Sequence, residues 1–208
     1  MVGFLDDYIK IVKKNSDGLS PKQKLLFQFV ITGIFAYYLM TSNEVGTGML
    51  IPFTGGVENG FYLELGWLFV PALFFIVLGT DNGVNFTDGL DGLAGGVSAI
   101  SSLTMLVVAL FVAEPGVSVI LACLTGACVG FMPYNLNPAK MFMGDTGAMF
   151  LGYILATMSI QGLFKFYAVI SFVVPFLILG LPIFDTAFAF IRRVAHGQSP
   201  MHADRSHI

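Results

Sequence analysis

Six long intervals without a charged residue constrain this chain more than any other feature of its sequence. The 208 residues are 56% hydrophobic and only 11% charged, a balance that no water-soluble domain of this size needs for its core. A helix needs about 20 apolar residues to cross the hydrocarbon core of a bilayer. The charge-free intervals are 25–43, 65–80, 92–113, 115–139, 146–164 and 166–184. The sequence therefore predicts an all-α polytopic membrane protein with about six transmembrane helices.

Residues 44–64 connect the first two intervals, and in the orientation argued below they form the only long connection on the external side of the membrane. Its apolar stretches 49–53 and 61–65 flank glycine and asparagine residues of the kind that form turns. This pattern predicts a short external β hairpin. The interval 65–80 is too short to span alone, and we expect it to borrow residues 61–63 from the preceding segment.

Basic residues predict the orientation, because lysine and arginine near helix ends favour the cytoplasmic side. If the N-terminus is cytoplasmic, only Lys165 of the ten basic residues lies outside. We therefore expect both termini in the cytoplasm. The basic residues are also too few, and too interleaved with apolar segments, to indicate binding to nucleic acid.

All nine aspartates fall on the cytoplasmic side of this topology, whereas all four glutamates fall outside. A short carboxylate close to the backbone suits a hard cation such as Mg²⁺, which proteins usually hold with one or two carboxylates plus substrate phosphates. Aspartate is also a common turn and capping residue, and this simpler interpretation is preferred for Asp17 and Asp204. The cytoplasmic loops that carry the other aspartates are separated by even numbers of crossings, so they can meet in one site.

Two motifs in the first half of the chain carry candidate site residues. Asp6 and Asp7 are adjacent and precede a lysine-rich segment, so one could orient a nucleophile and the other a metal; a solvated helix end is the alternative. Asn85, Asp88 and Asp91 are spaced three residues apart, which places them near one face if the segment is helical. Three polar groups on one face at the membrane boundary are costly to keep for structure alone.

Asp145 opens the fifth interval and is the third candidate. An anion or a metal-bound phosphate at a helix N-terminus gains from the helix dipole and from the free N–H groups. An aspartate at this place is also an ordinary N-cap. The preceding residues Asn135, Asn137 and Lys140 add two amides and a cation to the same side of the membrane, which favours a functional role.

These motifs resemble the polyprenyl-phosphate N-acetylhexosamine-1-phosphate transferase superfamily, glycosyltransferase family 4, over almost the whole chain. The segments 3–10 and 85–94 are closest to its phospho-N-acetylmuramoyl-pentapeptide transferase branch. The motif at 142–147 is shared by both branches. The segments 182–186 and 199–207 resemble the branch that transfers GlcNAc 1-phosphate.

The resemblance implies transfer of N-acetylhexosamine 1-phosphate to undecaprenyl phosphate, with release of UMP, at the bacterial inner membrane. The donor would be UDP-GlcNAc or UDP-MurNAc-pentapeptide, the cofactor would be Mg²⁺, and a homodimer is left open. Roles follow for residues that match the family motifs. The metal ligands would be Asp145 and Asp7, the catalytic residues Asp6, Asp7 and Asp88, and the substrate-binding residues Lys10, Lys22, Asn85, Asp91, Asn135, Phe142 and His207.

The family normally has further spans before the paired aspartates, and a tail motif that continues beyond His207. The resemblance therefore implies that residues 1–208 form a single transmembrane catalytic domain that is partial at both ends.

A membrane cation or proton transporter is the alternative function, because ionisable groups can mark an ion pathway. Transporter sites tend to lie near the bilayer midplane. The charge-free intervals leave the bilayer centre without a carboxylate, with only Asp185 expected below the membrane surface. The sequence therefore favours the transferase.

Overall fold

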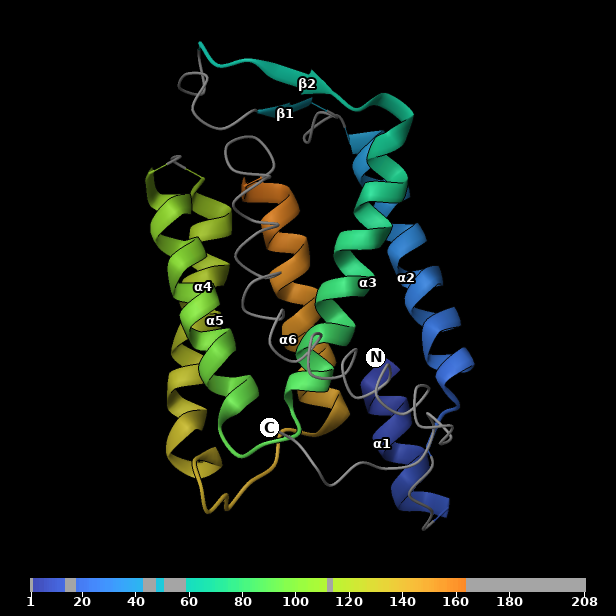
Figure 1. The fold of residues 1–208 in the computed structure, drawn as a ribbon, viewed down its shortest axis with the longest axis vertical. Coiled ribbons are helices and arrows are strands. Elements are labelled where there is room, and N and C mark those ends of the chain that lie inside the picture. The colour runs from blue at the N-terminus through green and yellow to red at the C-terminus, as the bar shows by residue number, and fades with distance from the viewer. Residues whose placement is uncertain (1, 14–17, 43–47, 51–58, 112–113, 164–208) are drawn as a thin grey trace, which may run out of the picture.

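Helices dominate the computed structural model, which describes residues 2–13, 18–42, 48–50, 59–111 and 114–163 (Figure 1). The α-helices are α1 (Val2–Lys13), α2 (Pro21–Ser42), α3 (Phe69–Thr87), α4 (Leu93–Phe111), α5 (Pro115–Asn135) and α6 (Gly144–Met158). A 3₁₀ turn, η1 (Gly66–Leu68), precedes α3, and a π-helical turn, η2 (Ser159–Leu163), follows α6.

The hairpin predicted between the first two spans is present. Strands β1 (Gly48–Leu50) and β2 (Tyr62–Glu64) pair antiparallel, with Met49 opposite Leu63. The hairpin lies at one end of the helix bundle, and α1 lies at the other (Figure 1). The residues that the second span was expected to borrow therefore belong largely to β2, so that part of the prediction is wrong.

Four helical segments in the described part of the chain are long and apolar enough to cross a membrane. They are Pro21–Ser42, Gly66–Thr87, Leu93–Phe111 and Pro115–Asn135. The chain therefore folds as a helical membrane protein, as the sequence predicts. The fifth predicted span corresponds to α6 followed by η2, and the sixth, 166–184, lies outside the described residues. The total of six spans stays a prediction.

The second span gains its length at its C-terminal end. α3 continues past Asp81 to Thr87, whereas the charge-free interval ends at residue 80. The Asp81 side chain is only 4% exposed, and its Oδ2 accepts a hydrogen bond from Gln28 Nε2 of α2 at 2.7 Å. A carboxylate with a partner on a neighbouring helix can remain inside a spanning helix. Asp81 therefore lies inside a candidate spanning segment, whereas the sequence placed only Asp185 below the membrane surface.

α2 begins where its first turn is capped by side chains. Gln23 N donates a hydrogen bond to Ser20 Oγ, and Ser20 N donates one to Gln23 Oε1. This reciprocal pair is a capping box, and Pro21 fits the first helical position because it has no N–H to satisfy. The cap fixes the start of α2 and hence the position of Lys24 one turn later.

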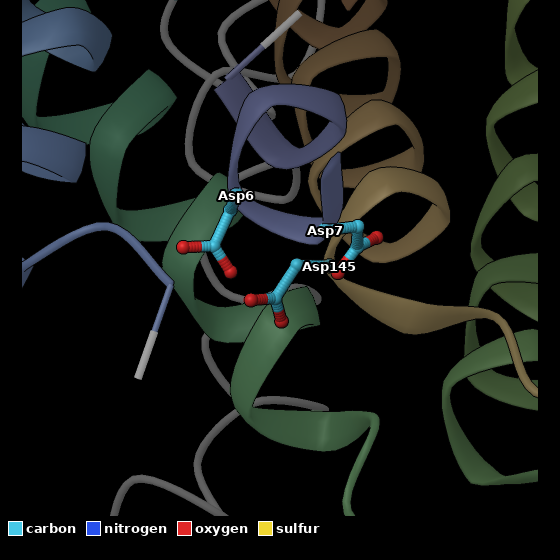
Figure 2. Close-up of side chains that lie close together, drawn as sticks. All are labelled: Asp6, Asp7 and Asp145. Atoms are coloured by element: carbon cyan, nitrogen blue, oxygen red, sulfur yellow. The ribbon is translucent and has the colours of Figure 1, made fainter. Parts of the chain in front are cut away.

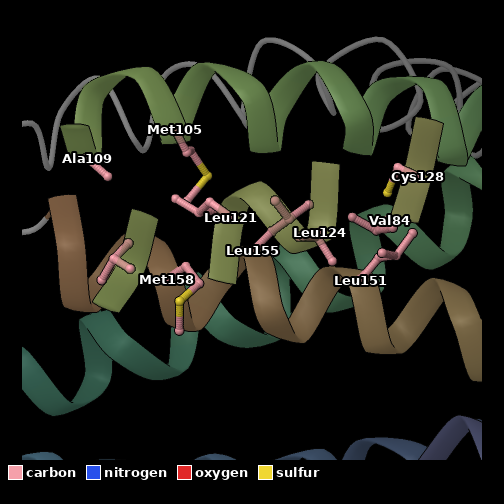
Figure 3. Close-up of a cluster of buried hydrophobic side chains, with 10 residues drawn as sticks. Val84, Met105, Ala109, Leu121, Leu124, Cys128, Leu151, Leu155 and Met158 are labelled. Carbon is pink, nitrogen blue, oxygen red and sulfur yellow. The ribbon is translucent and has the colours of Figure 1, made fainter. Parts of the chain in front are cut away.

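α6 lies between the α4–α5 pair and the α2–α3 pair (Figure 1). Two buried apolar clusters surround it. The cluster shared with α3, α4 and α5 contains Val84, Met105, Ala109, Val117, Leu121, Leu124, Cys128, Leu151, Leu155 and Met158 (Figure 3). The cluster shared with α2, α3 and η2 contains Ala36, Leu39, Phe69, Leu73, Val77, Ala156 and Ile160. Because lipid is as apolar as these side chains, close packing rather than exclusion of water holds the helices together.

Two glycines allow the closest helix contacts. A Cβ at Gly152 of α6 would lie 2.7 Å from Asp81 Cα of α3. A Cβ at Gly3 of α1 would collide with the Asp145 carbonyl oxygen of α6. Small residues at such contacts let helix backbones approach each other. α6 is thereby held against both α3 and α1.

Replacing Gly152 by valine is expected to destabilise the α3–α6 contact. The new Cβ would meet the backbone of Asp81, which cannot rotate away, so the helices must separate. Overpacking of this kind costs about 1–3 kcal/mol, and thermal unfolding in detergent micelles should show a lower midpoint. Gly126→Val is the matched control, because a Cβ there meets nothing within 4 Å. Equal losses in the two variants would contradict the role of Gly152.

Candidate functional site

Three aspartates from two helices meet at the end of the bundle opposite the hairpin. Asp6 and Asp7 lie on α1, and Asp145 lies in the first turn of α6 (Figure 2). Each offers a carboxylate oxygen, and these oxygens lie within 4.8 Å of one another. The contact between α1 and α6 at Gly3 holds the two helices at this spacing. Residues 139 positions apart in the chain therefore form one acidic cluster.

Asp6 is the buried member of the cluster, with no exposed surface. Its Oδ1 accepts a hydrogen bond from Leu19 N at 2.6 Å. Its Oδ2 lies 2.6 Å from Lys10 Nζ and 3.0 Å from Lys24 Nζ. Gly18, at φ +55°, brings the Leu19 amide close, and a Cβ there would lie 2.5 Å from Asp6 Oδ1. Both carboxylate oxygens of Asp6 are thus held in place.

Asp145 faces the same two lysines. Its Oδ2 lies 2.8 Å from Lys10 Nζ and 2.7 Å from Lys24 Nζ, while its Oδ1 accepts a hydrogen bond from Asn85 Nδ2 at 2.9 Å. The N-cap of α6 is Met143, and Asp145 lies inside the first turn. The alternative that Asp145 is an ordinary N-cap is therefore wrong, because its carboxylate points to neighbouring helices instead of its own amides.

The partners of Asp145 and Lys10 shift both pKa values. Burial alone would raise the pKa of the Asp145 carboxyl, but hydrogen bonding lowers it well below its ordinary range. The groups that donate these hydrogen bonds are Lys10, Lys24 and Asn85. Burial alone would lower the pKa of Lys10, but Asp145 and Asp6 raise it above its ordinary value. Both groups therefore carry their charges across the physiological pH range.

Asp7 supplies the cap that α6 lacks from its own sequence. Its Oδ2 accepts hydrogen bonds from Thr146 N, at 2.8 Å, and from Thr146 Oγ1. Gly144 has φ +66°, and a Cβ there would lie 3.1 Å from the same oxygen. An anion at this position is also stabilised by the positive end of the helix dipole. Asp7 thus fixes the start of α6 from α1.

Asp88 lies beside the cluster at the end of α3. Burial raises the pKa of its carboxyl to about 6, and the charge of Asp145 adds to the rise. A hydrogen bond from the Gly144 backbone lowers this pKa, and the charge of Asp7 raises it. Asn85 and Asp88 therefore both face the start of α6, as the sequence predicts.

Asp91 does not share that face. α3 ends at Thr87, so the three-residue spacing no longer describes a helical surface at Asp91. Its Oδ2 instead accepts hydrogen bonds from Asn137 Nδ2 at 3.2 Å and from Ala139 N at 3.0 Å. The expected common face of three residues is therefore wrong for this one.

Asn135 links the connection after α3 to the connection before α6 by hydrogen bonds. It is only 3% exposed; its Oδ1 accepts a hydrogen bond from Gly92 N at 3.2 Å, and its Nδ2 donates one to the Met141 carbonyl at 2.9 Å. Both halves of the amide are used inside the protein. Asn135 and Asp91 together join the loop after α3 to the loop before α6, which positions Asp88 and Asp145.

The lysine that reaches the cluster from α2 is Lys24, which the sequence reasoning missed. The predicted Lys22 is exposed in the first turn of α2, and its role stays a prediction. One signal could have found Lys24: it is the last charge before the first span, one turn from the buried Gln28. That signal is useful only once α2 is known to pack beside α1.

Two further predicted residues lie away from these contacts. Phe142 is 78% exposed in the connection that leads into α6. His207 lies outside the described residues. Their predicted contacts with substrate stay predictions.

The acidic cluster fits Mg²⁺ by the chemistry of its donors. The ligands that Asp6, Asp7 and Asp145 offer are carboxylate oxygens, which hard cations prefer. Three carboxylates face two ammonium groups, so the cluster keeps a formal negative charge that a divalent cation can neutralise. The lysines beside it are suited to phosphate oxygens.

Comparison with known proteins gives consistent matches. A family model described as glycosyl transferase family 4 matches residues 1–163. The phospho-N-acetylmuramoyl-pentapeptide-transferase of Desulforudis audaxviator is 46% identical over 154 residues, which are 73% of this chain and 46% of that protein. The phospho-N-acetylmuramoyl-pentapeptide-transferase of Clostridioides difficile is 42% identical over 160 residues, which are 76% of this chain and 48% of that protein. A probable undecaprenyl-phosphate N-acetylglucosaminyl 1-phosphate transferase of Bacillus subtilis is 38% identical over all 208 residues, or 53% of its length. The chain thus spans about half the length of the curated relatives it matches.

Mg²⁺ is expected to raise the thermal unfolding midpoint of the purified chain in detergent. A ligand that binds only the folded state stabilises it, by about 2.7 kcal/mol at 100 times its Kd. Asp145→Asn should remove most of this rise, because it removes one charged ligand from the cluster. Glu114→Gln is the control. Glu114 is an acidic residue at the N-cap of α5, outside the acidic cluster, and this variant should keep the full rise. An equal rise in Asp145→Asn would place the ion elsewhere.

Proposed function

Because this chain belongs to glycosyl transferase family 4, we propose that it carries the catalytic site of a polyprenyl-phosphate sugar-1-phosphate transferase. The reaction moves N-acetylhexosamine 1-phosphate from a UDP-sugar to undecaprenyl phosphate and releases UMP. One observation carries this proposal: Asp6 and Asp145, from opposite ends of the matched region, share the same two lysines. Carboxylates for a metal and cations for phosphates are what phosphoryl transfer requires.

The chain's own residues divide the work by their chemistry. Asp145 and Asp7 are the proposed ligands of Mg²⁺, which supplies charge neutralisation for the diphosphate of the donor when bound. Lys10 and Lys24 bind phosphate oxygens and exchange part of their present contacts with Asp6 for them. Asp6, freed from that pairing, orients the attacking lipid phosphate or accepts its proton. Phosphoryl transfer gains most from such positioning and electrostatic stabilisation.

Five of the other predicted residues also have proposed roles. Asp88 faces it from the end of α3 and is proposed as a further catalytic carboxylate. Asn85 holds Asp145 by its hydrogen bond, which keeps that carboxylate directed at the cluster. Asp91 and Asn135 fix the adjoining loops, and Phe142 offers an exposed ring on which a base could stack.

UDP-GlcNAc is the donor we favour. The alignment with the GlcNAc 1-phosphate transferase of Bacillus subtilis takes in the whole chain, including residues 164–208. The alignments with the two muramoyl-pentapeptide transferases cover about three quarters of it. The tail of the chain is the part we expect to meet the sugar. The higher identity of the muramoyl relatives over the region they share keeps UDP-MurNAc-pentapeptide as the second candidate.

We propose an inner-membrane protein with both termini and the acidic cluster in the cytoplasm. The charge distribution supports this orientation, since Lys10 and Lys24 lie at the cluster and the hairpin lies at the opposite end. UDP-sugars are made in the cytoplasm, so the cluster would face its substrate. The bilayer supplies the lipid acceptor.

A cation or proton transporter is not favoured. The family model and the named relatives are transferases. Asp81 is the carboxylate that the described spans do contain, and Gln28 already occupies one of its oxygens. The aspartates Asp6, Asp7 and Asp145 gather at one end of the bundle and not along a path through it.

The reaction is expected to be measurable as Mg²⁺-dependent release of UMP from UDP-GlcNAc in proteoliposomes that contain undecaprenyl phosphate. Asp145→Asn should lower kcat roughly 100-fold or more, because the metal loses a ligand where charge develops. Glu114→Gln should retain activity. UDP-MurNAc-pentapeptide is tested in parallel to decide the donor.

Two results would overturn the assignment. UMP release that is unaffected by Asp145→Asn would show that Asp145 is not the metal ligand. Ion flux in the same vesicles without any sugar nucleotide, together with no UMP release, would support the transporter instead.

A further inference from the structure

A second polar cluster lies inside the bundle, between the spanning segments α2 and α3. Gln28 Nε2 donates hydrogen bonds to Asp81 Oδ2 at 2.7 Å and to Asn82 Oδ1 at 3.4 Å. Asn82 Nδ2 donates in return to Gln28 Oε1 at 3.1 Å and to the Leu78 carbonyl at 2.8 Å. Both halves of the Gln28 amide are therefore bonded to α3, which allows only one orientation of the side chain.

This cluster is costly to keep inside a spanning region. Gln28 is 5% exposed and Asp81 is 4% exposed. Asp81 Oδ1 has no hydrogen-bond partner in the part of the chain that the structure describes. A buried polar atom without a partner costs about 1–3 kcal/mol, and hydrogen bonds between spanning helices return only about 0.6 kcal/mol on average. Stability alone is a weak reason for a carboxylate at this position.

The cluster lies one helical turn from the site on both helices. Gln28 follows Lys24 by four residues on α2, and Asp81 precedes Asn85 by four on α3. Four residues advance a helix by about 6 Å and return to nearly the same face. Lys24 and Asn85 contact the two oxygens of Asp145, Oδ2 and Oδ1. The bond between Gln28 and Asp81 therefore determines how the two groups that hold Asp145 lie relative to each other.

α6 docks at the same level. Gly152 contacts the Asp81 backbone so closely that a Cβ would lie 2.7 Å from its Cα. Gly152 follows Asp145 by seven residues, about two turns, and so lies on the same face of α6. The helices that carry Lys24, Asn85 and Asp145 are thus fixed to one another at Asp81.

We propose that Gln28 and Asp81 are positioning residues for the acidic cluster. Their hydrogen bond sets the register of α2 against α3, which places Lys24 and Asn85 on the two oxygens of Asp145 and keeps that carboxylate directed at the metal. The effect on catalysis rests on the proposed function. The effect on metal binding does not, because it needs neither sugar nucleotide nor lipid.

The test compares four variants of the full chain: Gln28→Leu, Asp81→Leu, Asp81→Asn and Thr32→Val. The two leucine variants remove the hydrogen bond and leave an apolar side chain of similar size. Asp81→Asn keeps an oxygen that accepts from Gln28 Nε2, so it should behave as the wild type. Thr32→Val removes another buried polar group of α2, one turn beyond Gln28, and is the matched control.

Two quantities are measured for each variant: the Mg²⁺ concentration that gives a fixed rise in the thermal unfolding midpoint, and kcat for UMP release. The leucine variants should raise the first and lower the second, each roughly 10–100-fold, as loss of support around a metal site does. Asp81→Asn and Thr32→Val should change neither. Unfolding midpoints without Mg²⁺ are recorded as well, so that a folding defect is seen separately.

A purely structural role would look different. Leucine variants that are less stable, yet keep the wild-type Mg²⁺ requirement and kcat in their folded fraction, would overturn the inference. An equal effect of Thr32→Val would do the same. If the wild type releases no UMP, the proposed function fails. A raised Mg²⁺ requirement in both leucine variants would still support the positioning role.

Discussion

The sharing of two ammonium groups between Asp6 and Asp145 is the interaction on which this end of the molecule depends. Lys10 and Lys24 each contact both carboxylates, at 2.6–3.0 Å. Without these lysines, α1 and α6 would bring only carboxylates together, and like charges repel each other strongly where burial limits screening by water. The lysines hold these helices in place, and they leave the cluster with the oxygen donors and cations that a metal-bound phosphate needs.

Several contacts from other elements hold the first turn of α6 in place. Asp7 caps it from α1, and Asn85 binds Asp145 from α3. Asn135 fixes the loop that leads into it. α6 also packs at the centre of the bundle, so a displacement of its first turn would be opposed by both apolar clusters. A rigid element that carries the proposed metal ligand Asp145 is a favourable arrangement for the proposed site, because groups that act by positioning need rigid support.

The errors of the sequence reasoning share one physical cause. The second span was predicted to end before Asp81, because a charged residue was expected to lie outside the bilayer. The hydrogen bond from Gln28 on another helix makes the burial of Asp81 tolerable. Asp91 was placed on a common face because its spacing is helical, whereas α3 ends before it. Lys24 was overlooked beside Lys22 because only the packing of α2 against α1 distinguishes them. Each error concerns a partner from another element.

The sequence by itself determined the helical membrane class, the hairpin and the family, because long apolar intervals and short polar motifs are local properties of the chain. It also indicated that Asp6, Asp7, Asn85, Asp88 and Asp145 belong together. Only the tertiary structure decided which oxygen faces which cation, that Asp7 caps α6, and that the Gln28–Asp81 bond lies one turn from the site. The Gln28–Asp81 and Asp7–Thr146 bonds join residues 53 and 139 positions apart, and no local pattern encodes the distance between side chains on different helices.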